Sequence, residues 1–262
     1  MSPQQSQSTN AREAQVWAAL EHVSDPELDE SVVELGFVTT VETDGEGGVD
    51  IGFRLPTYWC AANFAFLMAD DMRRAAKALP WVTRVAVRLG EHMNDAQINH
   101  GIAHGMSFDQ TFGEEASGNS LEEVRQIFAV KAFQRRQEKL LRHLLEAGHP
   151  DDQLVSLSIA QLDALRLNAD GQALRARYLD RRGVVASDAP GPDATAFVDQ
   201  SGVAVPTAAL PGHLRSLRRV SVNTDFNGAL CRGLLATRYG ADAPDPGVQP
   251  IHFVRSQASL AG

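Results

Sequence analysis

The sequence predicts a two-layer α/β fold of the α+β type, with a small N-terminal domain of element order α-β-β-α-β followed by a mainly α-helical region. Three observations lead to this fold class. Apolar residues recur at helical spacing before residue 24, alternate in two short segments around a Gly-rich turn, and return to helical spacing through much of residues 121–240. With 262 residues, of which 44% are hydrophobic, the chain can bury a sizeable core.

The N-terminal domain is predicted over residues 11–112. Its first helix should stop at Asp25-Pro26, because proline lacks a backbone donor and restricts the residue before it. A polar, Gly-rich turn between two alternating segments is typical of a β-hairpin, and Pro80 should end the second helix. The expected elements are a helix over 11–23, strands over 37–41 and 49–55, a helix over 60–79, a strand over 82–89, and a short helix over 94–105 that begins at the Asn94 cap and stops at Gly105.

Residues 121–240 are predicted to form the helical region, behind a linker over residues 113–120. Ser120 and Glu123 have the spacing of a capping box, which marks the start of a long amphipathic helix over 121–145. Shorter helices are expected over 158–167, 171–182, 212–219 and 226–239, with a turn near 200–202. Residues 1–10 are expected to be a disordered polar tail, and residues 241–262 an extended tail.

Composition and charge exclude several classes of protein. The formal net charge of -9 lies entirely within residues 11–112, and such an acidic surface repels nucleic acid, whose phosphates bind Lys and Arg. No stretch approaches the ~20 consecutive apolar residues that a membrane span needs. The opening ten residues lack the charged start and apolar run of a signal peptide. We therefore expect a soluble, cytoplasmic protein that binds neither nucleic acid nor membranes.

Four short pieces occur in order along the N-terminal domain. They are Asp25-Pro26-Glu27 after the first helix, Leu35-Gly36 before the first strand, Cys60 at the start of the second helix, and residues 81–87 in the third strand. Together they resemble the small domain of the iron-sulfur cluster assembly factor family, also called metal-sulfur cluster biosynthesis proteins, over roughly residues 16–89. The resemblance implies a non-enzymatic accessory protein that handles iron or an iron-sulfur cluster transiently for an apo-metalloenzyme client. A homodimer is compatible with this role.

Cys60 is the candidate cargo-binding residue. A thiolate at a helix start faces free backbone N–H groups and the positive end of the helix dipole, and both favour the metal-binding form. The alternative is that Cys60 is a small buried apolar residue, which is the commoner fate of a free cysteine. The second cysteine, Cys231, follows in an apolar, Ala-rich helix and is predicted to be structural. Asp25 and Glu27 either end the first helix or, as the resemblance implies, lie beside Cys60 in a cofactor-binding site.

The chain also departs from the family pattern in two places. Ala61 replaces the proline that usually follows the cysteine, and residues 90–95 replace an Asp-Pro-Pro-Trp-like segment. This replacement segment resembles the divergent form of the domain that accompanies bacterial multicomponent diiron monooxygenases. The resemblance therefore implies a diiron monooxygenase subunit as the client.

Three histidines of the same part of the chain are further candidate metal ligands. His100 and His104 lie four residues apart, which is a recognised ligand spacing on a helix, and His92 precedes them. The alternative is a pair of solvent-exposed histidines without a function. If Cys60, His92 and one histidine of the pair converge, their mixed S/N donors suit iron or zinc better than magnesium or calcium.

Three functions are consistent with these residues. The leading hypothesis is the maturation factor described above. A metal-free binding chaperone for a partner subunit is the alternative. An enzyme with Cys60 as nucleophile and His92 as its base is the third, although the sequence has no recognisable phosphate loop, dinucleotide fingerprint or oxyanion motif.

Overall fold

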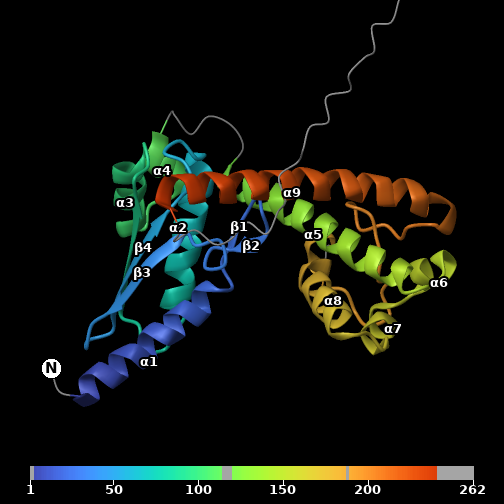
Figure 1. The fold of residues 1–262 in the computed structure, drawn as a ribbon, viewed down its shortest axis with the longest axis horizontal. Helices are drawn as coiled ribbons and strands as arrows, with labels where there is room; N and C mark the ends of the chain where they lie inside the picture. Colours follow the sequence, from blue (N-terminus) through green and yellow to red (C-terminus); the bar gives the residue numbers. More distant parts are fainter. Residues whose placement is uncertain (1–2, 114–119, 187–188, 241–262) are drawn as a thin grey trace, which may run out of the picture.

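In the computed structural model, which describes residues 3–113, 120–186 and 189–240, an N-terminal α/β unit and a helical region lie side by side (Figure 1). The N-terminal unit contains α1 (Pro3–Leu20), β1 (Ser24–Asp25), β2 (Glu30–Ser31), β3 (Val38–Thr43), β4 (Gly48–Arg54), α2 (Ala62–Lys77), β5 (Arg84–Gly90), α3 (Asp95–Ala103) and α4 (Phe108–Phe112). The predicted fold class and the α-β-β-α-β order are confirmed. The short ladder of β1 and β2 was not predicted.

The main sheet has the strand order β3-β4-β5. β3 and β4 form the expected antiparallel hairpin, whereas β5 lies parallel to β4. A parallel neighbour requires a crossover, and α2 provides it. Along β4, Val49, Ile51 and Phe53 are buried in the core, while the alternate residue Asp50 pairs with Arg88 of β5 on the exposed face.

The start of α1 and the cap of α3 differ from the prediction. α1 begins at Pro3 and therefore includes most of the stretch expected to be a disordered tail, because proline is tolerated in the first turn and nothing after it breaks the helix. At the end of α3, Gly105 takes φ +65 as expected of a helix stop, but the Asn94 side chain makes no capping hydrogen bond.

The helical region contains α5 (Leu121–Glu146), α6 (Asp151–Ser156), α7 (Ile159–Ala164), α8 (Ala169–Arg181), the 3-10 helices η2 (Arg182–Val185) and η3 (Thr207–Ala209), and α9 (Leu210–Tyr239). The capping box of Ser120 and Glu123 is confirmed at the start of α5. α9 is one helix of 30 residues instead of the two predicted, because the polar and β-branched residues in its middle are weak helix formers and not helix breakers. The predicted linker residues 114–119 and the tail 241–262 lie outside the described residues.

Two separate hydrophobic cores are joined by the long helices α5 and α9 (Figure 1). α5 starts against the N-terminal unit, where Phe128 meets the Phe64 ring of α2 at 4.8 Å, and its later residue Leu141 is buried in the second core. α9 runs in the opposite direction, with Leu217 in the second core and Leu235 in the first. Helices α1 and α9 therefore both contribute to the core of the N-terminal unit. No helix among the described residues is long and apolar enough to span a membrane.

Candidate functional site

Cys60 lies in the loop between β4 and α2, which we call the cysteine loop (residues 55–61). Its side chain is half-buried, and its Sγ lies 3.0 Å from Oγ1 of Thr57. The prediction that Cys60 starts the helix is wrong by two residues: α2 begins at Ala62, with Ala61 as N-cap. Among the described residues no helix N–H donates to the sulfur, because the thiol turns back toward its own loop.

His92 fixes the cysteine loop from the other side. This buried histidine accepts a hydrogen bond from the Asn94 N–H at Nδ1 (3.1 Å), so its proton sits on Nε2, which donates to the backbone oxygen of Cys60 (2.7 Å). Both ring nitrogens are therefore engaged. In this arrangement His92 positions the loop, and it neither contacts the thiol as a base nor offers a free ligand nitrogen.

The histidine pair lies on the exposed face of α3. Ile98 and Ile102 are buried as predicted, and the ring centroids of His100 and His104 lie 4.2 Å apart, with the ring planes tilted by 37°. Nδ1 of His104 also hydrogen-bonds to the backbone oxygen of His100 (2.8 Å). Across residues 3–113, 120–186 and 189–240 no three His, Cys, Asp or Glu side chains are grouped to hold a metal ion. The structure thus does not bring the pair together with Cys60 and His92, and metal ligation by these histidines stays a prediction.

Asp25 and Glu27 belong to a loop that we call the acidic segment (residues 25–30). The Asp25 carboxylate is 8% exposed and accepts hydrogen bonds from the backbone N–H groups of Glu27 (2.9 Å) and Leu28 (2.8 Å). Burial raises the pKa of Asp25 from 3.8 to about 6, and the charges of Glu27 and Glu30 add to the rise, while the two hydrogen bonds oppose it. A buried carboxyl with a raised pKa is typical of a functional site.

The rest of the acidic segment is held by arginines of the helical region. Arg136 of α5 forms a bidentate pair with buried Asp29, with both N···O distances at 2.7 Å. Arg135 donates to the Leu28 oxygen (2.8 Å) and contacts Glu30 (3.3 Å). Asp29 and Glu30 therefore anchor the helical region to the N-terminal unit.

Helix α9 also contacts the acidic segment, and it packs the second cysteine against the core of the N-terminal unit. Nδ2 of Asn227 donates to the Glu27 carboxylate at 2.9 Å. One helical turn later, Cys231 packs half-buried against the same core as Cys60. Burial raises the pKa of the Cys231 thiol to about 12, and the carboxylates of Asp25 and Glu27 add to the rise.

The last turn of α9 holds the beginning of the cysteine loop. The Arg238 guanidinium donates to the backbone oxygen of Leu55 (3.5 Å) and to the Glu91 carboxylate (3.1 Å), and the Tyr239 hydroxyl, which has one proton to donate, lies 3.4 and 3.2 Å from the same two acceptors. The guanidinium of Arg54 lies over the Tyr239 ring, 3.7 Å from its centroid. The C-terminal helix is thus part of the architecture around Cys60.

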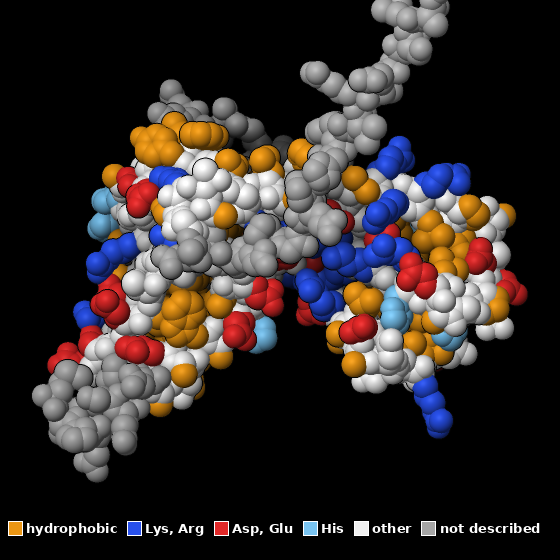
Figure 2. All heavy atoms as spheres, viewed as in Figure 1, with side chains coloured by type: hydrophobic (Ala, Val, Ile, Leu, Met, Phe, Trp, Pro, Cys, Tyr) orange, Lys and Arg blue, Asp and Glu red, His pale blue; other side chains and the backbone are white. Residues whose placement is uncertain are grey.

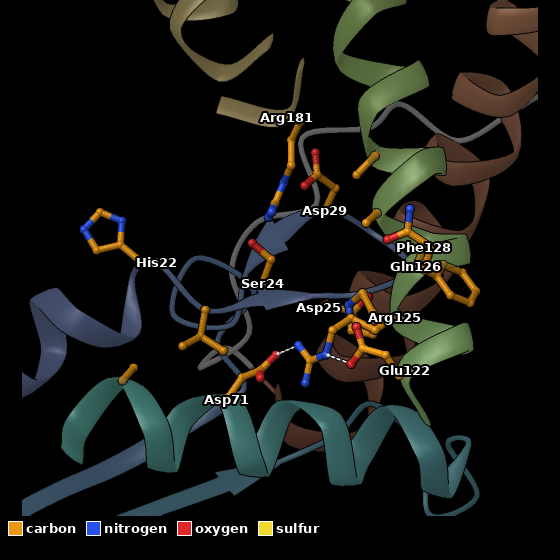
Figure 3. A pocket seen from close by; sticks show the side chains of 15 residues that line it. His22, Ser24, Asp25, Asp29, Asp71, Glu122, Arg125, Gln126, Phe128 and Arg181 are labelled. Carbon is orange, nitrogen blue, oxygen red and sulfur yellow. Dashed lines mark hydrogen bonds and ion pairs between the residues drawn. The ribbon is translucent and has the colours of Figure 1, made fainter. Parts of the chain in front are cut away.

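A polar cavity of about 450 Å³ lies between the acidic segment and the start of α5 (Figure 3). Asp25 and Asp29 contribute to its wall, and Arg125 bridges Asp71 of α2 (2.7 Å) and Glu122 of α5 (3.8 Å). Its lining mixes acidic and basic side chains, so ion pairs within the protein already neutralise much of its charge. The cavity gives solvent a route toward buried Asp25.

Large apolar side chains are exposed around the cysteine loop. In the loop, Tyr58 is 53% and Trp59 is 71% exposed, and Met93, whose N–H donates to the Tyr58 oxygen (2.9 Å), is 56% exposed. Figure 2 also shows apolar side chains gathered where the end of α9 lies beside α4. We call Tyr58, Trp59 and Met93 the apolar rim. Clusters of exposed aromatic residues are typical of a protein-binding surface.

Sequence reasoning missed the part of the site that α9 supplies. Cys231 was interpreted as structural, and Asn227 was not singled out. Their spacing of four residues places them on one face of a helix, but nothing local indicates that this face packs against the N-terminal unit. Only the path of α9 through the folded protein decides which residues this face contacts.

Comparisons with known proteins find similar sequences for the N-terminal unit. Residues 13–87 match the model of the iron-sulfur cluster assembly protein family. An uncharacterized protein of Methanocaldococcus jannaschii is 33% identical over 81 residues, which cover 31% of this chain and 83% of that protein. A crystallised domain of unknown function from Bacillus anthracis is 28% identical, with 32% of this chain and 78% of that chain covered and a TM-score of 0.30. By its N-terminal unit, the chain belongs to the iron-sulfur cluster assembly protein family.

Proposed function

We propose that this protein is an accessory maturation factor for a metalloenzyme, which delivers iron or an iron-sulfur unit to an apo-client through Cys60. The single observation that carries the proposal is the position of this thiol. It is half-buried at the base of the exposed apolar rim, in a loop fixed by His92 and Tyr239. A thiol held in this way can bind a soft or borderline metal and still be reached by a partner.

Asp25 and Glu27 would support the cargo electrostatically. The arginines of the helical region bind Asp29 and Glu30 of the same segment, whereas Glu27 accepts a hydrogen bond from Asn227 of α9. A negative carboxylate near the thiolate attracts a cation and holds it without closing the site. We further propose, from residues 90–95, that the client is a subunit of a bacterial diiron monooxygenase.

The test is an anaerobic transfer assay. The purified full-length protein is loaded with ferrous ion, with and without sulfide, and mixed with the apo-form of the monooxygenase subunit. Wild type should restore iron content and activity to the client, and Cys60→Ala should not. Circular dichroism should show an unchanged fold, because the side chain is only half-buried. Transfer at the wild-type rate by Cys60→Ala would refute the proposal.

A metal-free chaperone for the partner subunit is the second candidate, and the apolar rim favours it. In that case Cys60→Ala would still bind and stabilise the client, and metal analysis of the anaerobically purified complex would find no iron on the accessory protein. Replacing Trp59 would then impair the client more strongly than replacing Cys60. The ratio of these two effects separates the candidates.

A further inference from the structure

We infer that helix α9 is an interface between two copies of this chain, which pack the exposed faces of this helix against each other in opposite directions. The residues that carry the inference form a row that we call the apolar stripe: Val222, Phe226, Leu230 and Leu234. They lie outside residues 13–87, which match the family, and the inference does not depend on the proposed function.

The apolar stripe lies on the side of α9 that faces away from both cores. Its four side chains are between 36% and 60% exposed, whereas Leu217 and Leu235, on the opposite side of the helix, are buried in the second and the first core. Successive members of the stripe are four residues apart, so they form one continuous ridge about 18 Å long. A surface helix normally carries its large apolar residues on the buried side. Because α9 carries them on both sides, we infer that a second molecule covers the stripe.

Gly233 lies beside the apolar stripe, within the helix. Glycine weakens a helix interior relative to alanine, so its presence there needs a reason. The fold of the single chain does not supply one, since a Cβ built on Gly233 would meet no other described part of the chain within 4 Å. Close approach of a second backbone does supply one, because a side chain at this position would hold the other molecule away.

The spacing of the stripe fits a second copy of the same helix. Its members are placed symmetrically about residue 228. Two antiparallel copies of α9 therefore bring Phe226 against Leu230 of the partner subunit, and Val222 against Leu234 of the partner subunit. Each contact then occurs twice, as a two-fold symmetric interface requires.

The distribution of charge favours the same arrangement. Exposed Arg215 and Arg219 lie in the first half of α9, whereas Arg238 at its end contacts Glu91 of the N-terminal unit, whose side chain is 62% exposed. The formal net charge of -9 lies within residues 11–112 of that unit. An antiparallel pair places the basic half of each α9 beside the acidic unit of the other copy, whereas a parallel pair would place like charges together.

Sedimentation velocity of the purified full-length protein, over a dilution series, measures the association. Wild type should form a dimer of twice the 28.4 kDa chain mass. Phe226→Ser should raise the dissociation constant of the dimer at least about tenfold, because it removes an aromatic ring from the centre of the interface. Gly233→Leu should also raise it, although leucine favours the helix of the single chain over glycine. Val203→Ser is the control, since it removes an exposed apolar side chain outside α9 and should dimerise as wild type.

Disulfide cross-linking tests the direction of the two helices. Proteins that carry Val222→Cys or Leu234→Cys are oxidised separately and as a mixture. The mixture should form cross-linked dimers above the wild-type background, and neither protein alone should, because antiparallel pairing keeps identical stripe ends about 18 Å apart. Cross-links in either protein alone would contradict the antiparallel arrangement.

A wild-type protein that stays monomeric at every concentration would overturn the inference, and this includes the case in which Phe226 binds the client instead. Equal dissociation constants for wild type, Phe226→Ser and Gly233→Leu would also overturn it, because the dimer would then use another surface. Neither result touches the proposed function, which fails only if Cys60→Ala still delivers iron to the client.

Discussion

The acidic segment and the cysteine loop are both contacted by α9, yet they are built in opposite ways. Asp29 of the acidic segment is 4% exposed and bound by Arg136 from α5. In the cysteine loop Trp59 is 71% exposed, and the polar contact of the Cys60 sulfur is with the Thr57 hydroxyl of its own loop. In the acidic segment, ion pairs hold the two units together. In the cysteine loop, the thiol and the aromatic rings remain accessible to a partner. We infer that Asp29 and Glu30, at the end of the acidic segment, stabilise the packing of the two units, whereas Asp25 and Glu27 serve the function.

The largest expected effect comes from breaking the structural side of this comparison. Arg136→Ala leaves the buried Asp29 carboxylate facing only Arg177 at 4.0 Å, so we expect the free energy of unfolding to fall by about 3 kcal/mol or more. Urea denaturation measures the loss. Arg88→Ala is the control, because its ion pair with Asp50 is exposed and should cost at most about 1 kcal/mol. Equal losses in the two variants would show that Asp29 is not an anchor.

The second prediction concerns Asp25, whose pKa is raised to about 6 in the folded protein. The folded state then holds the proton more tightly than the unfolded chain, so stability is lost as pH rises from about 4 through about 6. Asp25→Asn keeps an oxygen for both backbone donors and never ionises. Relative to wild type it should be up to about 3 kcal/mol more stable at pH 7.5, with little difference at pH 4.

Urea denaturation of both proteins across this pH range checks the sign. A variant that is less stable than wild type at pH 7.5 would contradict the interpretation, because the ionised carboxylate would then be a structural anchor like Asp29. A gain in stability together with a loss of client activation would indicate that the protein tolerates this buried charge for function.

The third prediction tests the open side of the comparison. Trp59→Ala should leave the free energy of unfolding within about 0.5 kcal/mol of wild type, because the ring is exposed. If the apolar rim contacts the client, the dissociation constant should rise about tenfold or more. Isothermal titration with the client subunit measures it. Val203→Ala, at a side chain 60% exposed in the helical region, should bind as wild type; a matching loss there would argue against a specific rim.

The smallest expected effect concerns the hydrogen bond that helps to hold α9 against the acidic segment. Asn227→Ala removes the 2.9 Å hydrogen bond to Glu27 and should cost about 1 kcal/mol. Amide hydrogen exchange should become faster in the last turns of α9. It should not become slower in any part of the protein. Asn223→Ala, an exposed position one turn earlier, is the control. Unchanged exchange in the Asn227 variant would mean that Arg238 and Tyr239 alone hold the helix.

The sequence was a good guide to local structure and a poor guide to what α9 does. Period-two and helical spacing predicted the hairpin, the crossover helix and the capping box of Ser120, because these depend on neighbours along the chain. The β1–β2 ladder was not predicted, because two residues per strand are too few to show an alternating pattern. The contacts of Arg136 and Cys231 depend on how two long helices cross the N-terminal unit. For the same reason, the spacing of His92 and His100 in the sequence could not predict that both ring nitrogens of His92 are hydrogen-bonded.

The most direct test of the central claim is made in cells that produce the diiron monooxygenase together with either wild-type protein or Cys60→Ala. We predict that the variant accumulates to the wild-type level while the monooxygenase subunit accumulates without iron and without activity. A monooxygenase with full iron content and full activity beside the Cys60→Ala protein would contradict the account.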